Sequence, residues 1–302
     1  VHVNLLVPAD GEYVNRQDNS VVAANGCLYI VATPIGNLED ITYRAVRILN
    51  EVDLIACEDT RHTKKLLNHF QISTKLISYY REKEVSRGLQ IIHQLCNGQN
   101  VALVSDAGMP CISDPGYRLT AAAHDKGIPV VTIPGASAMV SAVSISGLNS
   151  DSFHFHGFLP SKKNERRKAI QSLAIVQSLL VFYESPHRLL VSLKDCLEVL
   201  GDRNAAVCKE LTKIHEQCIK GTLSEVIKEL CEKAVKGEYV LLIEGNTAGE
   251  LPPETDSLIE LLTWYKDETK NSLKDTVKAI AGDLGLSRSA VYSEALKMWD
   301  KD

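Results

Sequence analysis

Residues 101–116 read VALVSDAGMPCISDPG, and this stretch changes character partway along. Its first four residues form a short, largely β-branched apolar run that is typical of a buried strand. From Ser105 onward the run gives way to aspartate, glycine and proline, which tolerate or impose unusual backbone angles. In open α/β sheets, ligands bind beyond the carboxyl ends of the strands. The loop is therefore a candidate ligand site, although an ordinary strand-to-helix connection would also contain glycine and proline.

The same alternation of strand and helix extends on both sides of this stretch. Further apolar strands are expected at 27–33, 54–57, 75–79 and 129–133. Helices are expected at 42–49, 63–70, 85–96 and 117–126. Unbroken alternation over more than a hundred residues predicts a parallel, doubly wound sheet.

Each of these strands is followed by a polar or glycine-containing cluster. The clusters are 34–37 (PIGN), 58–61 (EDTR), 80–82 (YRE), 105–108 (SDAG) and 134–137 (PGAS). Parallel strands end at the same edge of a sheet, so we expect a ligand site along that edge. The chain contains neither a GxG nor a GxxxxGK[ST] motif, which are common phosphate-binding patterns. A nucleoside-like cofactor with little phosphate would fit these loops better.

A second α/β domain is expected at 149–248, after a first at 27–148. Its strands are predicted at 153–158, 178–183, 205–208 and 239–244, with helices at 189–200 and 223–234. Two adjacent sheets with polar loops predict a cleft between them. Residues 1–26 lack periodicity and are expected to form a poorly packed N-terminal extension. Residues 249–302 form a helical C-terminal module that resembles a helix-turn-helix, but its excess of acidic residues favours a packing or substrate-orienting role over DNA reading.

Composition excludes several classes of protein. The 302 residues are 45% hydrophobic and 24% charged, as in an ordinary soluble protein, and no apolar run approaches the length of a membrane span. The net charge of −5 argues against a generally basic nucleic-acid binder, so RNA would require a local patch. The eight cysteines include no CxxC pair, and we interpret them as reduced core residues of a cytoplasmic protein without a metal site.

The densest positive charge lies in residues 161–168. The basic residues of this run are Lys162, Lys163, Arg166, Arg167 and Lys168. Such a run is either the solvated start of a helix or a contact for nucleic-acid phosphates. His154 and His156 would share one face of the preceding strand, but without further ligands they do not predict a metal site.

Taken together, the loops resemble those of the ribosomal RNA small subunit methyltransferase I family, which has the tetrapyrrole-methylase fold. The motifs that carry the resemblance are LYIVATPIGNLEDITYRA (28–45), CEDTRHT (57–63), ALVSDAGMPCISDPGY (102–117), PGASA (134–138), SGLNSDSFHFHGFLPSKKNERRK (146–168), FYESPHRL (182–189) and ELTKIHE (210–216). The resemblance runs from about residue 28 to residue 244, and the helical tail also looks like that family's extension. It implies a cytoplasmic homodimer that uses S-adenosyl-L-methionine to methylate the 2′-oxygen of a cytidine in the decoding region of small-subunit (16S) rRNA.

The resemblance also implies where the cofactor binds. The matching positions are Pro34, Gly36, Ser105, Asp106, Ala107, Gly108, Pro134, Gly135, Ser137, Tyr183 and Leu211. S-adenosylmethionine needs no phosphate cradle, and a glycine-rich loop offers backbone N–H groups to its carboxylate.

Methyl transfer to a ribose hydroxyl depends on alignment, and on a general base or a cation that stabilises the alkoxide. Candidates along the sheet edge are Glu58, Asp59, Glu184 and Lys213, with His62 and His187 as further possibilities. The RNA-binding candidates are Arg61, Lys162, Lys163, Arg166, Arg167, Lys168, His187 and Arg188. Each could equally be a loop ion pair or a helix cap, and no spacing argument selects the base.

Two alternatives remain open at this point, because a fold does not fix a function. The chain could methylate a small tetrapyrrole or a protein, or it could be a non-catalytic RNA-binding assembly factor. The basic run and the helical tail favour RNA over a small ring. So small a positive patch offers little affinity for naked RNA, which makes the assembled 30S subunit the expected substrate.

Overall fold

The structure is a computed structural model that describes residues 25–232, 236–246, 257–269, 272–284 and 286–299. The chain divides into two compact units, Val1–Gly245 and Asn246–Asp302. Nearly all of the N-terminal extension expected at 1–26 lies outside the described residues.

The first sheet has five strands, all parallel, as the alternating pattern predicts. Its strands are β1 (Leu28–Val31), β2 (Leu54–Cys57), β3 (Leu76–Ser78), β4 (Val101–Val104) and β5 (Val130–Ile133). They lie in the order β3-β2-β4-β1-β5, which places β4 between β1 and β2 near the centre. The polar loop that follows β4 therefore begins in the middle of the sheet edge.

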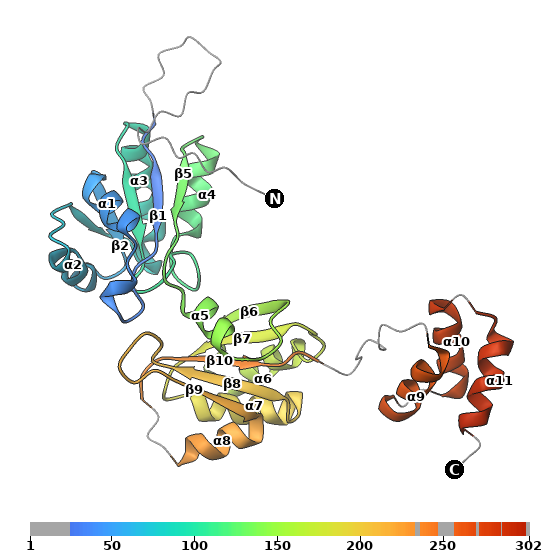
Figure 1. Cartoon of the computed structure of the whole chain (residues 1–302). Helices are drawn as coiled ribbons and strands as arrows, with labels where there is room; N and C mark the ends of the chain where they lie inside the picture. The colour runs from blue at the N-terminus through green and yellow to red at the C-terminus, as the bar shows by residue number, and fades with distance from the viewer. Residues whose placement is uncertain (1–24, 233–235, 247–256, 270–271, 285, 300–302) are drawn as a thin grey trace, which may run out of the picture. The chain divides into compact units, whose positions relative to one another are not determined.

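Helices cover both faces of this sheet (Figure 1). The covering helices are α1 (Tyr43–Glu51), α2 (Thr60–His69), α3 (Glu84–Cys96) and α4 (Tyr117–Asp125). Side chains of a strand alternate between faces, so Ile55 packs in the core with α1 and α2, whereas Ala56 packs in the core with α3 and α4. Thr42 begins α1 by accepting a hydrogen bond from the N–H of Ala45.

The second sheet is mixed, a feature that the sequence did not predict. Its strands are β6 (Phe153–Phe158), β7 (Leu179–Glu184), β8 (Asn204–Lys209), β9 (Gln217–Thr222) and β10 (Tyr239–Ile243), in the order β6-β7-β10-β8-β9. The last strand, β10, lies between β7 and β8 and is antiparallel to both. Tyr239, at its amino end, is therefore paired with Glu184 and Lys209 at the carboxyl ends of its neighbours.

The two faces of the second sheet are covered by different elements. One face packs against α6 (Lys163–Ser172), α7 (Leu189–Leu200) and α8 (Leu223–Cys231). The other face packs against α5 (Ala138–Ile145), which follows the first sheet directly and was not expected from the sequence. Figure 1 shows α5 on the side of the second sheet opposite α6 and α7. Ala142 of α5 and Ile35 of the loop after β1 share one core with Val181 and Leu242, so the two sheets belong to one packed unit.

The second unit consists of α9 (Leu258–Glu268), α10 (Leu273–Asp283) and α11 (Arg288–Trp299). Leu262, Ile280 and Val291 are fully buried and form its core. The order of α10 and α11 agrees with the expected helix-turn-helix, while Gly285 between them lies outside the described residues. Within the described parts of the chain, no helix has the length and apolar character required to cross a membrane.

Candidate functional site

The loop after β4 is fixed to the end of β1 by backbone hydrogen bonds. The N–H of Thr33 donates to the carbonyl of Gly108 (2.9 Å), and the N–H of Gly108 donates to the carbonyl of Thr33 (3.0 Å). Gly108 has a φ of +78°, a conformation that favours glycine. The buried hydroxyl of Ser105 reaches the carbonyls of Ala107 and Gly108, at 3.3 Å each. Ser105 therefore holds the shape of the loop.

Unusual backbone conformations are concentrated in two loops. Cys111 and Ser113 after β4 have φ values of +70° and +66°, and Glu210 and Thr212 after β8 have values of +49° and +67°. Non-glycine residues adopt these angles only when the surrounding structure holds them there, and such residues cluster at ligand sites. The two loops are thus rigid parts of a candidate site, one from each sheet.

A cavity of about 460 Å³ lies between these loops. Cofactor and small-molecule sites have volumes of roughly 300–1,000 Å³, so the cavity can hold a molecule of that class. Several of the residues predicted to bind the cofactor line it: Asp106, Ala107, Gly108, Ser137, Tyr183 and Leu211. Because the lining comes from both sheets, the structure brings together residues that are over a hundred positions apart.

A second, smaller cavity of about 160 Å³ adjoins the first through Asp106, which lines both. Pro34 and Ser105, also predicted to bind the cofactor, line this smaller space together with His62 and Lys65. The remaining predicted positions, Gly36, Pro134 and Gly135, line neither cavity.

The charged residues that line the larger cavity are all acidic. The described lining contains no lysine, arginine or histidine, and its acidic residues are Glu58, Asp106, Asp114, Glu184 and Glu238. Ile35, Ile112, Phe158 and Leu211 provide apolar surface. A space that combines apolar walls with several carboxylates suits a ligand that has an apolar body and a positive charge.

Two of these carboxyl groups have raised pKa values. Burial raises the pKa of Glu58, and the neighbouring Asp114 and Asp106 raise it further, against the opposing effect of Arg81. Burial also raises the pKa of Asp114, while the hydroxyl of Ser105 lowers it. Like charges held together in a partly buried space resist ionisation, and a bound cation would relieve that repulsion.

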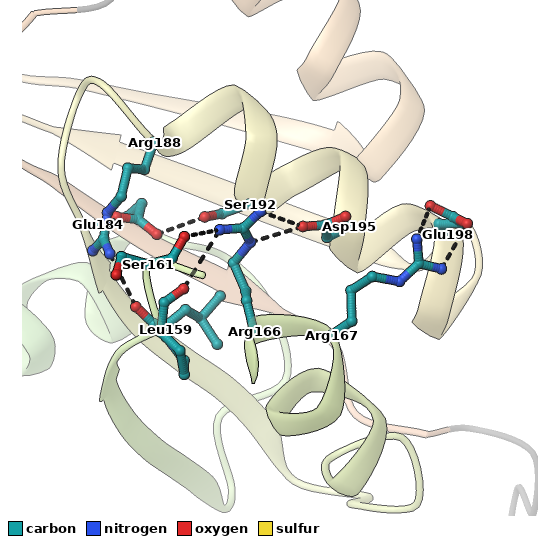
Figure 2. A network of polar contacts seen from close by, with 10 residues as sticks. Leu159, Ser161, Arg166, Arg167, Glu184, Arg188, Ser192, Asp195 and Glu198 are labelled. Carbon is teal, nitrogen blue, oxygen red and sulfur yellow. Dashed lines mark hydrogen bonds and ion pairs between the residues drawn. The ribbon is translucent and has the colours of Figure 1, made fainter. Parts of the chain in front are cut away.

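Glu184 is held in a network of polar contacts (Figure 2). One carboxylate oxygen accepts from the backbone N–H of Ser185 (2.7 Å) and pairs with Arg188 (2.9 Å), and the other accepts from the hydroxyl of Ser192 (2.6 Å). Both oxygens are therefore occupied, although the residue lines the cavity. This differs from the expectation of a general base, and the geometry indicates that Glu184 fixes the end of β7.

The basic run at 162–168 is split between the interior and the surface. Arg166 is 3% exposed and pairs with Asp195 through two nitrogens, at 2.6 and 2.7 Å (Figure 2). It also donates to the carbonyl of Ser161 (2.9 Å), so its guanidinium cannot reach a phosphate, contrary to expectation. Arg167 forms a two-pronged pair with Glu198 on the surface. Lys162, Lys163 and Lys168 are exposed, and His187 is exposed on the loop after β7.

Arg188 also has a structural set of contacts. Its guanidinium pairs with Glu184 and donates to the carbonyl of Leu159 at 3.2 Å and to the hydroxyl of Ser185 at 3.2 Å. It thereby joins the loop after β6 to the end of β7. Only part of its side chain remains available to a phosphate.

Asp59 and Arg61 interact with each other. The Asp59 carboxylate accepts the N–H of Arg61 (2.8 Å) at the start of α2 and also binds its guanidinium (2.9 Å). These hydrogen bonds lower the pKa of Asp59 to about 2, which makes it a weak base. Neither residue lines the larger cavity, and Arg61 remains exposed to solvent.

Lys213 connects three loops. Its ammonium pairs with Glu210 (2.9 Å) and Glu238 (3.0 Å), and its aliphatic stem packs against Gly36 of the loop after β1. A Cβ added at Gly36 would lie 2.6 Å from Cγ of Lys213, so only glycine leaves room for the lysine. Lys213 thus links the two halves of the unit next to the cavity without lining it.

The sequence reasoning missed several residues that the structure places at the site. Asp114 belongs to the loop singled out from the sequence but was not predicted to bind anything, and Glu238 lies at the amino end of β10. Lys64 and Lys65 are exposed on α2 beside the smaller cavity. The sequence TRHTKK (60–65) could have pointed to these two lysines, but only Arg61 of this run was considered as an RNA contact.

Within the described residues, no group of three or more histidine, cysteine or acidic side chains is arranged to hold a metal ion.

Comparison with known proteins shows the general class of enzymes to which the chain is related. Residues 27–227 match the family model of the Tetrapyrrole (Corrin/Porphyrin) Methylases. The fold also resembles the crystal structure of uroporphyrin-III C-methyltransferase from Thermus thermophilus complexed with S-adenosyl homocysteine. That match has a TM-score of 0.51 at 18% identity, covering 72% of this chain and 97% of the other. The chain therefore belongs to this class of methylases and has its fold.

Two curated relatives then define the particular family. Ribosomal RNA small subunit methyltransferase I of Halalkalibacterium halodurans is 48% identical over 272 residues, which cover 89% of this chain and 94% of the relative. The protein of the same name from Synechocystis sp. is 51% identical over 280 residues, covering 90% and 98%. The chain belongs to the ribosomal RNA small subunit methyltransferase I family.

Proposed function

We propose that this chain transfers a methyl group from S-adenosyl-L-methionine to the 2′-hydroxyl of a cytidine in the decoding region of small-subunit rRNA. The observation that carries the proposal is the acidic cavity between the two sheets, in a chain whose relatives are named as rRNA methyltransferases. The structural neighbour crystallised with S-adenosyl homocysteine supports the same cofactor class.

The residues of the cavity fit S-adenosylmethionine by charge and shape. This molecule carries an ammonium, a carboxylate and a sulfonium, so it has a net positive charge that the carboxylates of the lining can neutralise. Its adenosine would be held by apolar residues such as Ile35 and Leu211, and its carboxylate by backbone N–H groups of the loop after β4 other than that of Gly108, which is bonded to Thr33. When bound, the cofactor supplies the methyl group on a positively charged sulfur. A substrate rich in carboxylates, as many tetrapyrroles are, would meet repulsion in the same space.

Glu58 is the residue we assign to accept the proton of the ribose hydroxyl. It lines the cavity, and its raised pKa makes it a stronger base than an ordinary glutamate. The other acidic candidates are less suitable, because Asp59 has a lowered pKa and both oxygens of Glu184 are hydrogen-bonded. Lys213, as an ammonium between two glutamates, orients the loops after β1 and β8.

Two exposed basic groups are available for RNA phosphates. Lys65 of α2 lines the smaller cavity, which adjoins the acidic one, and the exposed Lys64 precedes it on the same helix. Lys162, Lys163 and Lys168 are exposed on and beside α6. Contacts of this kind position an RNA without reading its sequence. Their small number supports an assembled 30S subunit as the substrate; the homodimer and the cytoplasmic location remain predictions.

The test is transfer of labelled methyl from S-adenosylmethionine to small ribosomal subunits that lack the modification, with naked rRNA in parallel. Label in the RNA of the subunits, in larger amount than in naked rRNA, is the expected result. The proposal fails if the protein binds the cofactor yet labels neither substrate. A Lys64→Ala/Lys65→Ala variant is expected to keep cofactor affinity and lose transfer, with Lys126→Ala/Lys228→Ala, which changes lysines of α8 and of the end of α4, as the matched control.

A further inference from the structure

Two cysteines face each other across neighbouring strands of the second sheet. Cys208 of β8 is the register partner of Cys218 of β9, and their sulfur atoms are 3.1 Å apart. Residues directly opposite each other in an antiparallel pair have Cα atoms roughly 4.5–5.5 Å apart. That separation lies within the range of about 4.4–6.8 Å found for disulfides. The backbone is thus already placed for a cross-strand bond.

The two thiols have different surroundings. Cys208 is fully buried, lines the acidic cavity, and lies 4.0 Å from the carbonyl of Ala142 on α5. Cys218 is only partly buried and belongs to β9, the edge strand of the sheet. An edge strand has one neighbour instead of two, so it can shift more easily than a central strand. One thiol can therefore meet a solute while the other forms part of the cavity wall.

The environment also favours reaction at Cys218. The hydrogen bond with Cys208 lowers the pKa of Cys218, and the ammonium of Lys220 also lowers it, against the opposing effects of burial and Glu216. Lys220 lies two positions along β9 and therefore on the same face of the strand. The same hydrogen bond raises the pKa of Cys208, and burial adds to this effect. A lowered pKa favours the thiolate of Cys218, which is the reactive form of cysteine.

We propose that Cys208 and Cys218 are a site of reversible oxidation, at which a hydroperoxide such as hydrogen peroxide converts the two thiols into a disulfide in the wall of the acidic cavity. All described cysteines, including these two, are free thiols in the structure, and no other pair of sulfur atoms is in hydrogen-bond contact among the described residues. The site is therefore specific to this pair.

The reaction balances without a further reactant. The thiolate of Cys218 attacks one peroxide oxygen, the O–O bond breaks, and the leaving hydroxide takes a proton and becomes water, which leaves a sulfenic acid on Cys218. The thiol of Cys208 then gives up its proton and attacks that sulfur, the S–O bond breaks, and a second water leaves. The two thiols lose two electrons and the peroxide gains them. A dithiol reductant reverses the change by thiol–disulfide exchange.

The disulfide would alter the cavity, a consequence that rests on the proposed function. A disulfide has a sulfur–sulfur distance of about 2.05 Å, so the two sulfur atoms must approach each other by roughly 1 Å. Movement of the Cys208 side chain toward β9 opens a gap on the side of the cavity. A gap of about 0.5–1 Å between two atoms already removes roughly a quarter to a half of their van der Waals attraction. We expect cofactor affinity to fall by about threefold or more on oxidation.

The test begins with the bond itself. The full-length protein is treated with a small excess of hydrogen peroxide, its remaining thiols are blocked, and peptides are analysed by mass spectrometry before and after reduction. We expect a Cys208–Cys218 linked peptide that disappears on reduction, and we expect the Cys231→Ser variant to form it at the same rate, because Cys231 is an exposed cysteine of α8 outside the pair. Absence of the linked peptide, or equal pairing of Cys218 with other cysteines, overturns the proposal.

The second measurement is cofactor affinity, by calorimetry on the reduced and the oxidised protein. A loss of about threefold or more in the oxidised protein, restored by reduction and missing in Cys218→Ala, supports the proposal. An unchanged affinity despite a complete disulfide overturns the effect on the cavity. If the reduced protein binds no S-adenosylmethionine, the proposed function fails instead, while the peptide analysis still decides whether the disulfide forms.

Discussion

Replacing Arg166 by methionine should strongly lower the free energy of unfolding, and a second substitution at Asp195 should restore most of it. The guanidinium is 3% exposed, and its partner Asp195 is 4% exposed, with nitrogen–oxygen distances of 2.6 and 2.7 Å. Removing one member of a buried ion pair leaves the other charged and unpaired, which typically costs about 3–5 kcal/mol. The carbonyls of Pro160 and Ser161 also lose a donor. We therefore expect a loss of about 3–5 kcal/mol in the free energy of unfolding.

The assay is urea-induced unfolding, followed by circular dichroism, of Arg166→Met beside two comparison variants. The double variant Arg166→Met/Asp195→Leu removes both charges and should recover most of the lost stability, because apolar residues of similar volume often replace a buried pair without cost. Lys163→Met, at an exposed position of the same run, should change stability by no more than about 0.5 kcal/mol. The reasoning is refuted if Arg166→Met is as stable as Lys163→Met and instead weakens RNA binding, because the residue would then contact phosphate.

Three further predictions follow from single residues. Glu58→Gln should lower the rate of methyl transfer by about 100-fold or more. In the wild type, the rate should fall as pH drops through a raised pKa, above the ordinary 4.5, because the base must be deprotonated; a rate–pH profile in which both proteins share this acid limb would exclude Glu58 as the base. Gly36→Ala should lower the melting temperature, since its Cβ would displace Lys213, and an unchanged melting temperature would mean that the lysine moves without cost. Gly88→Ala, within α3 and with open space around its Cβ, should instead stabilise the protein by about 0.5–1 kcal/mol, as measured by urea unfolding.

The first sheet could be predicted closely because each of its strands is a short apolar run bounded by polar loops. β2 and β4 have the predicted bounds, and α3 and α4 differ from the predictions by one residue each. Hydrophobic periodicity suffices here, since the central strands β2, β4 and β1 are largely buried on both faces and every crossover contains a helix. The carboxyl ends of these strands meet as expected, which is why Asp106 and Gly108, both predicted to bind the cofactor, line the same cavity.

The second sheet could not be predicted to the same depth, because strand direction is a tertiary property. The sequence analysis looked for site residues only at the carboxyl ends of strands, so it missed Glu238 and Tyr239. These residues reach the cavity from the amino end of β10 because β10 runs antiparallel to its neighbours. The helix α5 was missed because its Ala-, Val- and Ser-rich sequence has little amphipathic pattern.

The basic run shows a different limit of sequence reasoning. Charge alone does not distinguish Arg166, which turns inward to Asp195, from Lys163, which faces solvent. The partner is 29 positions away in the chain, so no local pattern marks it. The contacts of the Glu184 carboxylate could not be predicted for the same reason, because Ser192 and Arg188 reach it only once α7 has folded onto β7.

The most direct test of the central claim is nucleoside analysis of rRNA that the protein has methylated in purified small subunits with labelled S-adenosylmethionine. We predict that the label is recovered as 2′-O-methylcytidine, and that Glu58→Gln incorporates it about 100-fold or more slowly than the wild-type protein. Label recovered on a base, or on a nucleoside other than cytidine, would contradict the assignment of this cavity to ribose methylation of cytidine.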